Sequence, residues 1–376
     1  MKILVHALSV AYGGGLIRTL NIINTFRQFP EIDFLILCPD IKYYKDVKSK
    51  NVTLLTISAL FLKKAARIYT DIFLVPATIK KYNPDLVLSL GNLPALTKRY
   101  QVFLHDNPLA SVMDFRKFGY KKIKDIMINR LRNKLLGKRL IYVDHLITQT
   151  SIQLNTLKEV YPLQIKKIEK KSVIPPSIPE FQISKSIKCN NISHINTDST
   201  IILCMSRYYP HKNIEILLEL ARIFKQNNNP FKIILTLSKS HDKKVSALLK
   251  KINKEKLYGY INNIGEISPL CLTEIMNYID ALILPSLLES YSLTYLEAMF
   301  FEKPVFTSDL DFAHEACKNA AFYFNPADAG DIYCTIVSAF QDPEKLKRKI
   351  NNEKTLLKNI HGWNTIMETV LKNIQI

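Results

Sequence analysis

Two glutamates eight positions apart, Glu289 and Glu297, are the residues of this chain best suited to bind a hydroxylated and phosphorylated ligand. The apolar run 281–285 predicts a buried strand, and the pattern after Ser292 predicts a helix, so Glu289 falls in the connecting loop and Glu297 about one turn inside the helix. Carboxylates accept hydrogen bonds from sugar hydroxyls, and helix N-termini attract phosphate. Taken alone, such a pair is more often two solvated surface charges.

The elements around this pair favour a ligand site. A second apolar run, 303–308, follows the predicted helix, so that strand, loop, helix and strand form a βαβ unit. Ligands bind at the carboxyl ends of the strands in such sheets, and this is where the loop 285–292 is expected.

Two cations, Arg207 and Lys212, follow another predicted strand, Thr200–Met205, and Asn213 comes directly after them. Arginine offers a planar fork of donors and lysine a point charge, so the two side chains can converge on one diphosphate. The alternative is a pair of surface cations around a helix start.

Three further groups of residues stand at strand ends in the first half of the chain. Glycines at 13–15 precede Arg18 after the first predicted strand, and glycine permits positive φ and close backbone approach to a ligand. A tight strand-to-helix turn is the alternative, and the segment is neither a P-loop nor a G-x-G-x-x-G pattern. The other strand-end residues are Asn92, His105 and Asp106. A structural role is the alternative for His105, and ordinary turn chemistry is the alternative for Asp106.

Together these segments resemble the retaining glycosyltransferases of family 4, the group 1 enzymes of GT-B fold. Glu289 and Glu297 match the E-x7-E signature, the segment 207–213 matches R-x4-K-N, and the segment 14–18 resembles G-G-x-x-R. Specific motifs cover most of 200–330, while the first half matches only by pattern. Ser290 and Ser292 depart from the family, because glycines are common at their positions.

The resemblance implies a role for each of these residues. His105 and Glu289 would contact the transferred sugar as catalytic-site residues, and Glu297 would bind the ribose. Arg207, Lys212 and backbone N–H groups near Ser292 would hold the diphosphate. The remaining implied donor-binding residues are Gly14, Gly15, Ser290, Tyr291 and Leu293, and those of the acceptor side are Arg18, Asn92 and Asp106.

Alternating strands and helices predict two Rossmann-like domains with doubly wound parallel sheets, which is the GT-B architecture with a cleft between the domains. We expect an acceptor-side domain at 1–175, a linker at 176–199 that follows a proline-rich stretch, and a nucleotide-sugar-binding domain at 200–358. By the resemblance, the C-terminal helix, 359–376, packs back on the first domain. The predicted strands lie at 2–7, 33–38, 52–57, 85–90, 101–104, 145–148, 200–205, 231–237, 260–265, 281–284, 304–307 and 321–324, and helices in the first half at 16–27, 64–81 and 120–138.

No metal or other cofactor is expected. The sole Asp-x-Asp sequence, Asp309-Leu310-Asp311, follows a late strand and is interpreted as turn chemistry, with cations and a helix terminus in place of a metal ion. The six cysteines have neither CxxC spacing nor metal-ligand spacing, so we expect reduced, buried thiols and no disulfide. The first apolar run is too short for a signal peptide and no run is long enough to span a membrane, so a cytoplasmic protein is expected.

The formal net charge of +19 is unevenly distributed. Between 116 and 139, ten lysines and arginines stand against one acidic residue, Asp125, while Ile123, Met127, Leu131 and Leu135 recur every four residues. A basic amphipathic helix suits an anionic membrane surface. Alternatively, the apolar face packs on the domain core and the cations face water. The sequence leaves both interpretations open.

We therefore expect a hexosyltransferase that moves a sugar from a nucleoside diphosphate donor to a hydroxyl acceptor. A lipid-linked saccharide or growing surface polysaccharide, as in capsule or lipopolysaccharide assembly, is the expected acceptor, reached from the inner face of the membrane. One alternative is a sugar-nucleotide epimerase or hydrolase of the same architecture, which would act without an acceptor. The other is a non-catalytic basic protein that binds membrane or nucleic acid, although no recognised nucleic-acid module is present and no nucleic-acid partner is expected.

Overall fold

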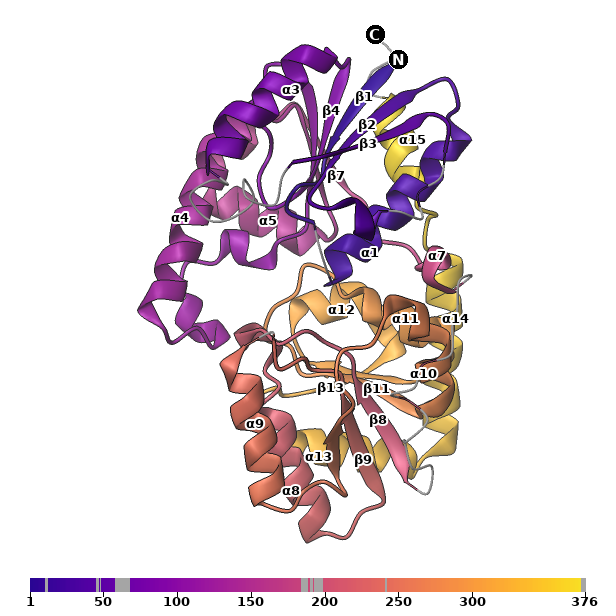
Figure 1. Cartoon of the computed structure of the whole chain (residues 1–376). Coiled ribbons are helices and arrows are strands. Elements are labelled where there is room, and N and C mark those ends of the chain that lie inside the picture. Colours follow the sequence, from indigo (N-terminus) through magenta and orange to yellow (C-terminus); the bar gives the residue numbers. More distant parts are fainter. Residues whose placement is uncertain are drawn as a thin grey trace. The chain divides into compact units, whose positions relative to one another are not determined.

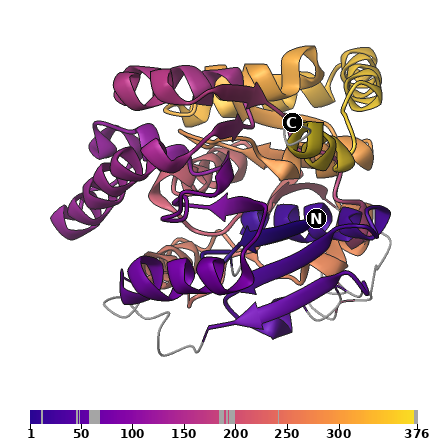
Figure 2. The same ribbon diagram turned by 90° about the horizontal axis from the view of Figure 1, so that it is seen from above.

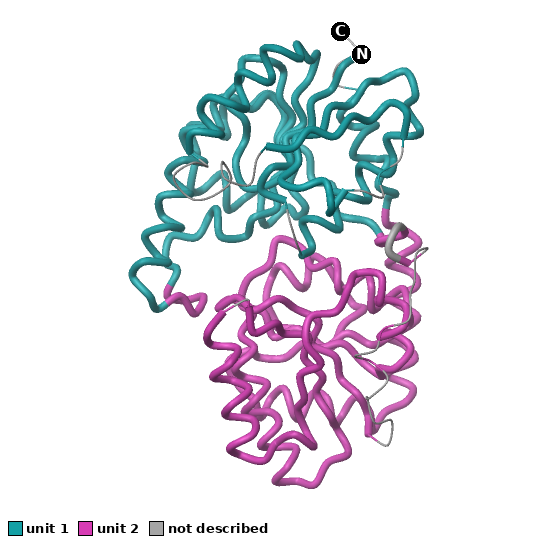
Figure 3. Tube along the Cα trace, viewed as in Figure 1, with its two compact units in different colours: residues 1–115, 121–177, 361–376 teal, residues 116–120, 178–360 magenta. Residues whose placement is uncertain are grey.

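The computed structural model describes residues 1–10, 13–44, 47, 49–57, 68–183, 189, 192, 199–240 and 242–372. The chain divides into two compact units (Figure 3). Unit 1 comprises residues 1–115, 121–177 and 361–376, and unit 2 comprises residues 116–120 and 178–360.

Among the described residues of unit 1, seven parallel strands form one sheet in the order β3-β2-β1-β4-β5-β6-β7 (Figure 1). The strands are β1 Lys2–His6, β2 Asp33–Cys38, β3 Val52–Thr56, β4 Leu86–Gly91, β5 Tyr100–His105, β6 His145–Thr148 and β7 Lys170–Val173. The helices are α1 Gly13–Asn24, the π-helical stretch η4 Thr70–Leu74, α3 Val75–Tyr82, α4 Ile123–Arg139, α5 Ser151–Val160, α6 Pro162–Lys167 and α15 Asn364–Lys372.

Helices cover both faces of this sheet. Leu4, Val87 and Phe103 share one face; Leu4 and Val87 pack with α3, and Phe103 packs with α4 and α5. Helices α1 and α15 lie on the other side (Figure 1). Seen from above, α15 is next to the N-terminal part of the chain (Figure 2), and it contacts α1 although more than three hundred residues separate them.

The described part of unit 2 contains six parallel strands in the order β10-β9-β8-β11-β12-β13. The strands are β8 Thr200–Cys204, β9 Phe231–Leu235, β10 Ile261–Asn263, β11 Ala281–Leu284, β12 Val305–Ser308 and β13 Ala321–Phe324. The helices are α7 Glu180–Ile183, the 3-10 turn η8 Pro210–Lys212, α8 Ile216–Gln226, α9 Lys243–Lys254, α10 Leu272–Tyr278, α11 Leu293–Phe300, α12 Asp311–Cys317, α13 Ala329–Phe340 and α14 Pro343–Lys358.

Alternate residues of β8 face opposite sides of this sheet, as the pleat of a strand requires. Ile202 and Cys204 join a large core cluster with helices α8, α9 and α13, whereas Ile201 and Leu203 pack against α10. A sheet buried on both faces explains why its strands read as continuous apolar runs. The predicted fold class, two doubly wound parallel-sheet α/β domains, is confirmed.

Two local predictions were wrong. Strand β7 was not predicted, because Lys170-Lys171-Ser172-Val173 is a half-exposed edge strand without an apolar run. Gly13, Gly14 and Gly15 form the first turn of α1 rather than a loop before it, with Gly13 at a φ of +67°. Residues 58–67, which include the start of the helix predicted at 64–81, lie outside the described residues, as does most of the predicted linker.

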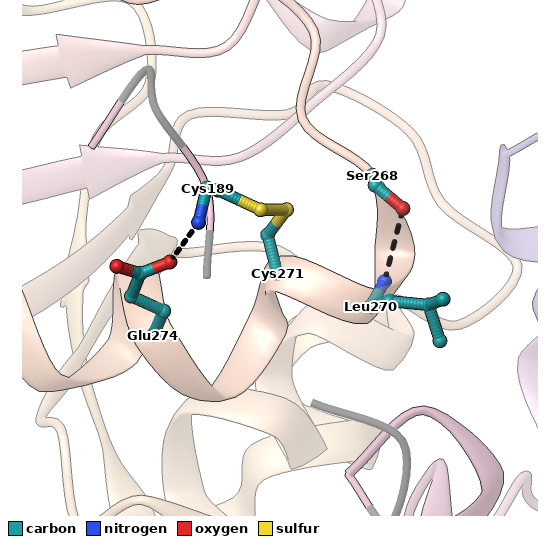
Figure 4. The surroundings of a disulfide bond; sticks show 5 residues. All are labelled: Cys189, Ser268, Leu270, Cys271 and Glu274. Carbon is teal, nitrogen blue, oxygen red and sulfur yellow. Dashed lines mark hydrogen bonds between the residues drawn. A yellow bond between two sulfur atoms is a disulfide. The ribbon is translucent and has the colours of Figure 1, made fainter. Parts of the chain in front are cut away.

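The expectation that all six cysteines are unpaired was also wrong. Cys189 and Cys271 form a disulfide across 82 residues, with their Cα atoms 6.0 Å apart (Figure 4). The Glu274 carboxylate accepts a hydrogen bond from the Cys189 N–H (2.5 Å), so Cys189 is attached twice to the start of α10. The two cysteines lie 82 residues apart, so their spacing in the sequence did not indicate that they pair. Of the remaining cysteines, Cys38, Cys204 and Cys317 are buried thiols and Cys334 is exposed.

The basic helix α4 packs on unit 1 with a different face from the one its apolar periodicity suggests. Ile126, Asn129 and Leu136 are buried, whereas Ile123, Met127 and Leu131 of the predicted row are exposed and its last member, Leu135, is half-buried. The interpretation that this row packs on the domain core is therefore wrong. Within the described residues, no helix is both long and apolar enough to span a membrane.

Candidate functional site

The candidate donor site of unit 2 lies where the strand order of its sheet reverses. Strand β8 is followed in the chain by β9 on one side, but its neighbour on the other side is β11. The loops that leave β8 and β11 therefore separate at the same edge of the sheet, which is where doubly wound folds bind ligands. One of these loops carries Arg207 and Lys212, and the other carries Glu289.

Lys212 and Glu289 form the centre of this site. The Lys212 Nζ atom lies 2.5 Å from Glu289 Oε1, and the side chains are only 17% and 7% exposed. Ser286 donates a hydrogen bond from its hydroxyl to the same carboxylate oxygen (2.7 Å). The Leu287 N–H donates to the His211 carbonyl oxygen (2.7 Å), which joins the two loops through the backbone as well. Thus a cation and an anion predicted as ligand contacts are held together and largely shielded from water.

The loop after β8 has a defined conformation that positions Lys212. Pro210 begins the turn η8, and Asn213 ends it in the left-handed region at a φ of +54°. Asparagine tolerates this region better than most residues, and here its side-chain amide donates to the Pro326 carbonyl oxygen (2.7 Å). Arg207 lies half-buried in the same loop. Lys212 is thus fixed by its neighbours along the chain.

The second loop leads into the N-terminus of α11. Ser290, Ser292 and Leu293 are buried, and Tyr291 is half-buried against the main core cluster of unit 2. Ser292 precedes the helix, and in this part of the described structure its side chain makes no capping hydrogen bond. The first N–H groups of a helix have no acceptor inside the helix, so this end of α11 can donate to an anion.

Glu297 lies inside α11, where it is 3% exposed. Burial raises the pKa of its carboxyl group from 4.5 to about 7, and a hydrogen bond with the Thr294 side chain opposes that shift. Glu297 therefore changes charge near neutral pH, whereas an exposed glutamate is fully ionised there. Nearby in α11, Tyr295 and Thr307 share a hydrogen bond between their hydroxyl groups (2.7 Å), which ties the helix to β12.

Three residues at this site were not identified from the sequence. Ser286 bonds Glu289, and its position directly after a buried strand was the available signal. His211 is buried, and its Nδ1 lies 3.0 Å from the hydroxyl of Tyr120, which belongs to unit 2 although it lies 91 residues earlier. Burial first, and then Lys212, lower the pKa of His211 to about 4, so it is neutral at physiological pH. No sequence motif connects His211 to Tyr120.

The Asp-x-Asp segment lies at the end of β12 and the start of α12. The Asp309 carboxylate lies 2.5 Å from His314 Nε2, and the His314 ring stacks on Tyr323. Across the described residues, no group of three or more histidine, cysteine or acidic side chains has the arrangement of a metal site.

In unit 1, two residues predicted for the acceptor side, Arg18 and Asp106, lie next to each other. The Arg18 guanidinium forms an ion pair with the Asp106 carboxylate (2.8 Å), and the Arg18 side chain is 3% exposed. Asp106 follows β5, whereas Arg18 lies in α1. A Cβ atom on Gly15 would lie 3.4 Å from an Asp106 carboxylate oxygen, which is ordinary van der Waals contact. Gly14 lies in the same helical turn, where a Cβ atom would meet open space.

His105 and Asn92 end neighbouring strands of the same sheet. His105 is completely buried, and desolvation lowers its pKa to about 4, so the imidazole is neutral at physiological pH. The Asn92 N–H donates to the Ser9 hydroxyl (3.3 Å), and Gly91 before it has a φ of +126°. This φ is one that residues with a side chain rarely adopt, and a Cβ atom on Gly91 would also lie 2.2 Å from the Ser9 hydroxyl oxygen, so glycine is favoured there. The loops after β1 and β4 are therefore in contact.

Part of the chain matches a known protein family. Residues 188–356 match the model of the family "Glycosyl transferases group 1". That range contains the Lys212–Glu289 pair and all of α11. The chain is also 24% identical over 265 residues to the O-antigen chain mannosyltransferase RfbU of Salmonella typhimurium, covering 70% of this chain and 69% of the relative.

Solved structures of glycosyltransferases share the fold over the whole chain. HepE from Anabaena, solved in complex with UDP and glucose, has a TM-score of 0.71 at 17% identity, covering 100% of this chain and 99% of HepE. WaaG, a glycosyltransferase involved in lipopolysaccharide biosynthesis, has a TM-score of 0.72 at 14% identity, with 100% of both chains covered. At such identities the likeness shows the GT-B fold and does not assign substrates.

Proposed function

We propose that this protein is a retaining, family 4 hexosyltransferase that uses a nucleoside diphosphate sugar as donor. The observation that carries the proposal is the shielded Lys212–Glu289 pair beside the N-terminus of α11, at the strand-order reversal of unit 2. A cation, an acceptor of sugar hydroxyl hydrogen bonds and a helix terminus are the three groups that such a donor requires.

Each group has a distinct part in the proposed reaction. Arg207, Lys212 and the first N–H groups of α11 bind the diphosphate, Glu289 accepts hydrogen bonds from the transferred sugar, and Glu297 accepts them from the ribose. In unit 1, neutral His105 contacts the transferred sugar, while Arg18, Asn92 and Asp106 serve the acceptor side. These last assignments rest on the family resemblance.

The bond between the anomeric carbon and the diphosphate oxygen breaks as the acceptor oxygen bonds to the same carbon and passes its proton to the departing diphosphate. Negative charge grows on the leaving diphosphate, so cations already fixed beside it stabilise the transition state more than the ground state. Since Arg207, Lys212 and α11 supply that stabilisation, we propose that the transfer is independent of metal ions.

The acceptor in this proposal is a saccharide, lipid-linked or part of a growing surface polysaccharide. Its support is the O-antigen mannosyltransferase among the relatives and the lipopolysaccharide glycosyltransferase among the similar folds. The donor class is supported by HepE, whose structure holds UDP and glucose.

Donor binding and transfer can be tested together. Calorimetric titration with UDP, GDP and ADP and their sugars should give a clear preference for one base, and the preferred sugar should be transferred to a saccharide acceptor in the presence of EDTA. Nuclear magnetic resonance of the product should show the anomeric configuration of the donor. Inversion at the anomeric carbon would contradict the retaining mechanism. Loss of transfer with EDTA would contradict independence of metal ions. Rapid epimer formation without acceptor would instead support an epimerase.

The charge state of Glu297 gives a pH prediction for donor binding. Its pKa of about 7 means that the carboxylate that accepts ribose hydrogen bonds becomes populated as pH rises through neutrality. The donor KM should therefore fall by roughly tenfold between about pH 5.5 and pH 8.5 in the wild type. Glu297→Gln should remove this dependence, because the amide does not titrate. A similar pH profile in the two proteins would contradict the assignment of Glu297.

A further inference from the structure

Helix α4 presents an apolar row to solvent. Ile123, Met127 and Leu131 are 70%, 64% and 57% exposed, and they recur at intervals of four residues on one side of the helix. Exposing three large apolar side chains in succession is unfavourable in water, and contiguous apolar surface of this kind marks an interaction site. The row therefore calls for a partner outside the unit.

Basic side chains surround this row. Lys124, Arg130 and Lys134 are exposed on the same helix, and Lys121 and Lys122 precede it. Between 116 and 139 Asp125 is the sole acidic residue, and it is half-buried. Lysine and arginine can extend their charged ends away from an apolar row while their stems lie along it. The partner must accordingly combine negative charge with an apolar interior.

The opposite face of α4 fixes the helix to unit 1. Ile126 and Leu136 are buried, and the Asn133 amide donates to the carbonyl oxygens of Leu109 (3.0 Å) and Val112 (3.2 Å). At the C-terminal end, Arg139 donates to the Pro94 carbonyl oxygen (3.2 Å). Because the helix is anchored in this way, the exposed row is a permanent feature of the folded unit.

We propose that α4 docks unit 1 on an anionic lipid bilayer, with Ile123, Met127 and Leu131 inserted at the level of the headgroups and the surrounding lysines and arginines bound to lipid phosphates. An amphipathic helix lying in the interface uses these two contributions together. Nucleic acid would satisfy the charges and leave the apolar row in water. The inference does not rest on the proposed transferase activity, since docking needs neither donor nor acceptor.

Flotation of the full chain with vesicles tests this proposal. The wild type should float with vesicles of phosphatidylglycerol and phosphatidylcholine and remain behind with phosphatidylcholine alone. The variant Ile123→Ser/Met127→Ser/Leu131→Ser should bind at least about tenfold more weakly, because its apolar contribution is lost. The variant Lys124→Gln/Arg130→Gln/Lys134→Gln should lose about a hundredfold, at roughly a factor of five for each charge near an anionic surface.

Matched variants make the result specific to α4. Ile41→Ser/Tyr43→Ser/Leu55→Ser removes three exposed apolar side chains elsewhere in unit 1, and Lys243→Gln/Lys250→Gln/Lys254→Gln removes three exposed charges from α9. Both controls should bind as the wild type does, and circular dichroism should show the same fold throughout. Absence of wild-type binding overturns the proposal, as does equal loss in the control variants. Loss in the charge variant alone overturns insertion of the apolar row.

Discussion

Replacing Lys212 by methionine is expected to lower kcat/KM for sugar transfer by about a hundredfold to a thousandfold. A fixed cation beside a leaving group that gains negative charge contributes on this scale, as single preorganised donors do in other enzymes. Glu289→Gln is expected to have a comparable effect, because a neutral amide oxygen accepts hydrogen bonds from sugar hydroxyls more weakly than a carboxylate does. Steady-state kinetics with the preferred donor measures both losses.

Each single variant also breaks the Lys212–Glu289 ion pair, so it changes stability as well as catalysis. Lys212 and Glu289 are largely buried, so removing either leaves the other charge without its partner and costs about 3–5 kcal/mol of unfolding free energy. The double variant Lys212→Met/Glu289→Gln removes both charges and should regain most of that stability. Its transfer activity should remain as low as that of the single variants. Stability and catalysis are thereby separated.

A second ion pair in the same unit is the control. Arg222 donates from Nε and Nη2 to the two carboxylate oxygens of Glu255, at 2.6 and 3.0 Å, in a partly exposed position on α8. Arg222→Met should cost less than about 1 kcal/mol and leave kcat/KM unchanged. Activity in the double variant close to the wild-type value would refute the roles assigned to Lys212 and Glu289.

The sequence predicted every strand of the two described sheets except β7, and its motifs contained Lys212 and Glu289, but it did not predict the contacts between them. Strands such as β8 and β11 are buried on both faces, so they read as apolar runs, whereas β7 is polar and escaped notice. The motifs identified Lys212 and Glu289 separately. That they pair across 77 residues depends on the neighbouring positions of β8 and β11 in the sheet, which spacing along the chain does not encode.

Periodicity could not decide which face is buried where a helix has two apolar stripes. In α4, Ile123, Met127 and Leu131 form one row and Ile126 and Leu136 belong to another, and either satisfies the spacing of a buried helix face. In the folded unit, Ile126 and Leu136 are the residues that are buried. For the same reason, nothing near Cys189 pointed to Cys271, because a disulfide depends on the distance between two Cα atoms in the fold.

Glu353, which is not part of the candidate site, is expected to make the stability of unit 2 depend strongly on pH. This residue of α14 is fully buried, and its burial raises the pKa of the carboxyl group from 4.5 to about 9, with the Val305 backbone and Lys349 opposing the shift and Glu302 adding to it. The folded state therefore holds a proton that the unfolded chain releases above pH 4.5. Stability should fall as pH rises from about 5 to 8, by at most about 4 kcal/mol.

Glu353→Gln isolates this contribution, because the amide has nearly the same shape and does not titrate. We compare the unfolding free energy of the variant with that of the wild type at each pH. This difference should favour the variant by about 2–4 kcal/mol more at pH 8 than at pH 5. Glu297 also has a raised pKa, but its contribution is common to both proteins and cancels in the difference. Denaturant unfolding followed by circular dichroism at the two pH values gives the comparison.

Two internal controls locate the effect. Trp363, the single tryptophan of the chain, lies in unit 1, so its fluorescence should report an unfolding transition that Glu353→Gln does not shift. Glu344→Gln changes an exposed glutamate of the same helix and should give no difference between the two pH values. Glu353→Gln could instead alter stability equally at pH 5 and pH 8. Glu353 of the folded protein would then keep one protonation state over that range, and its burial could not be the source of the pH dependence.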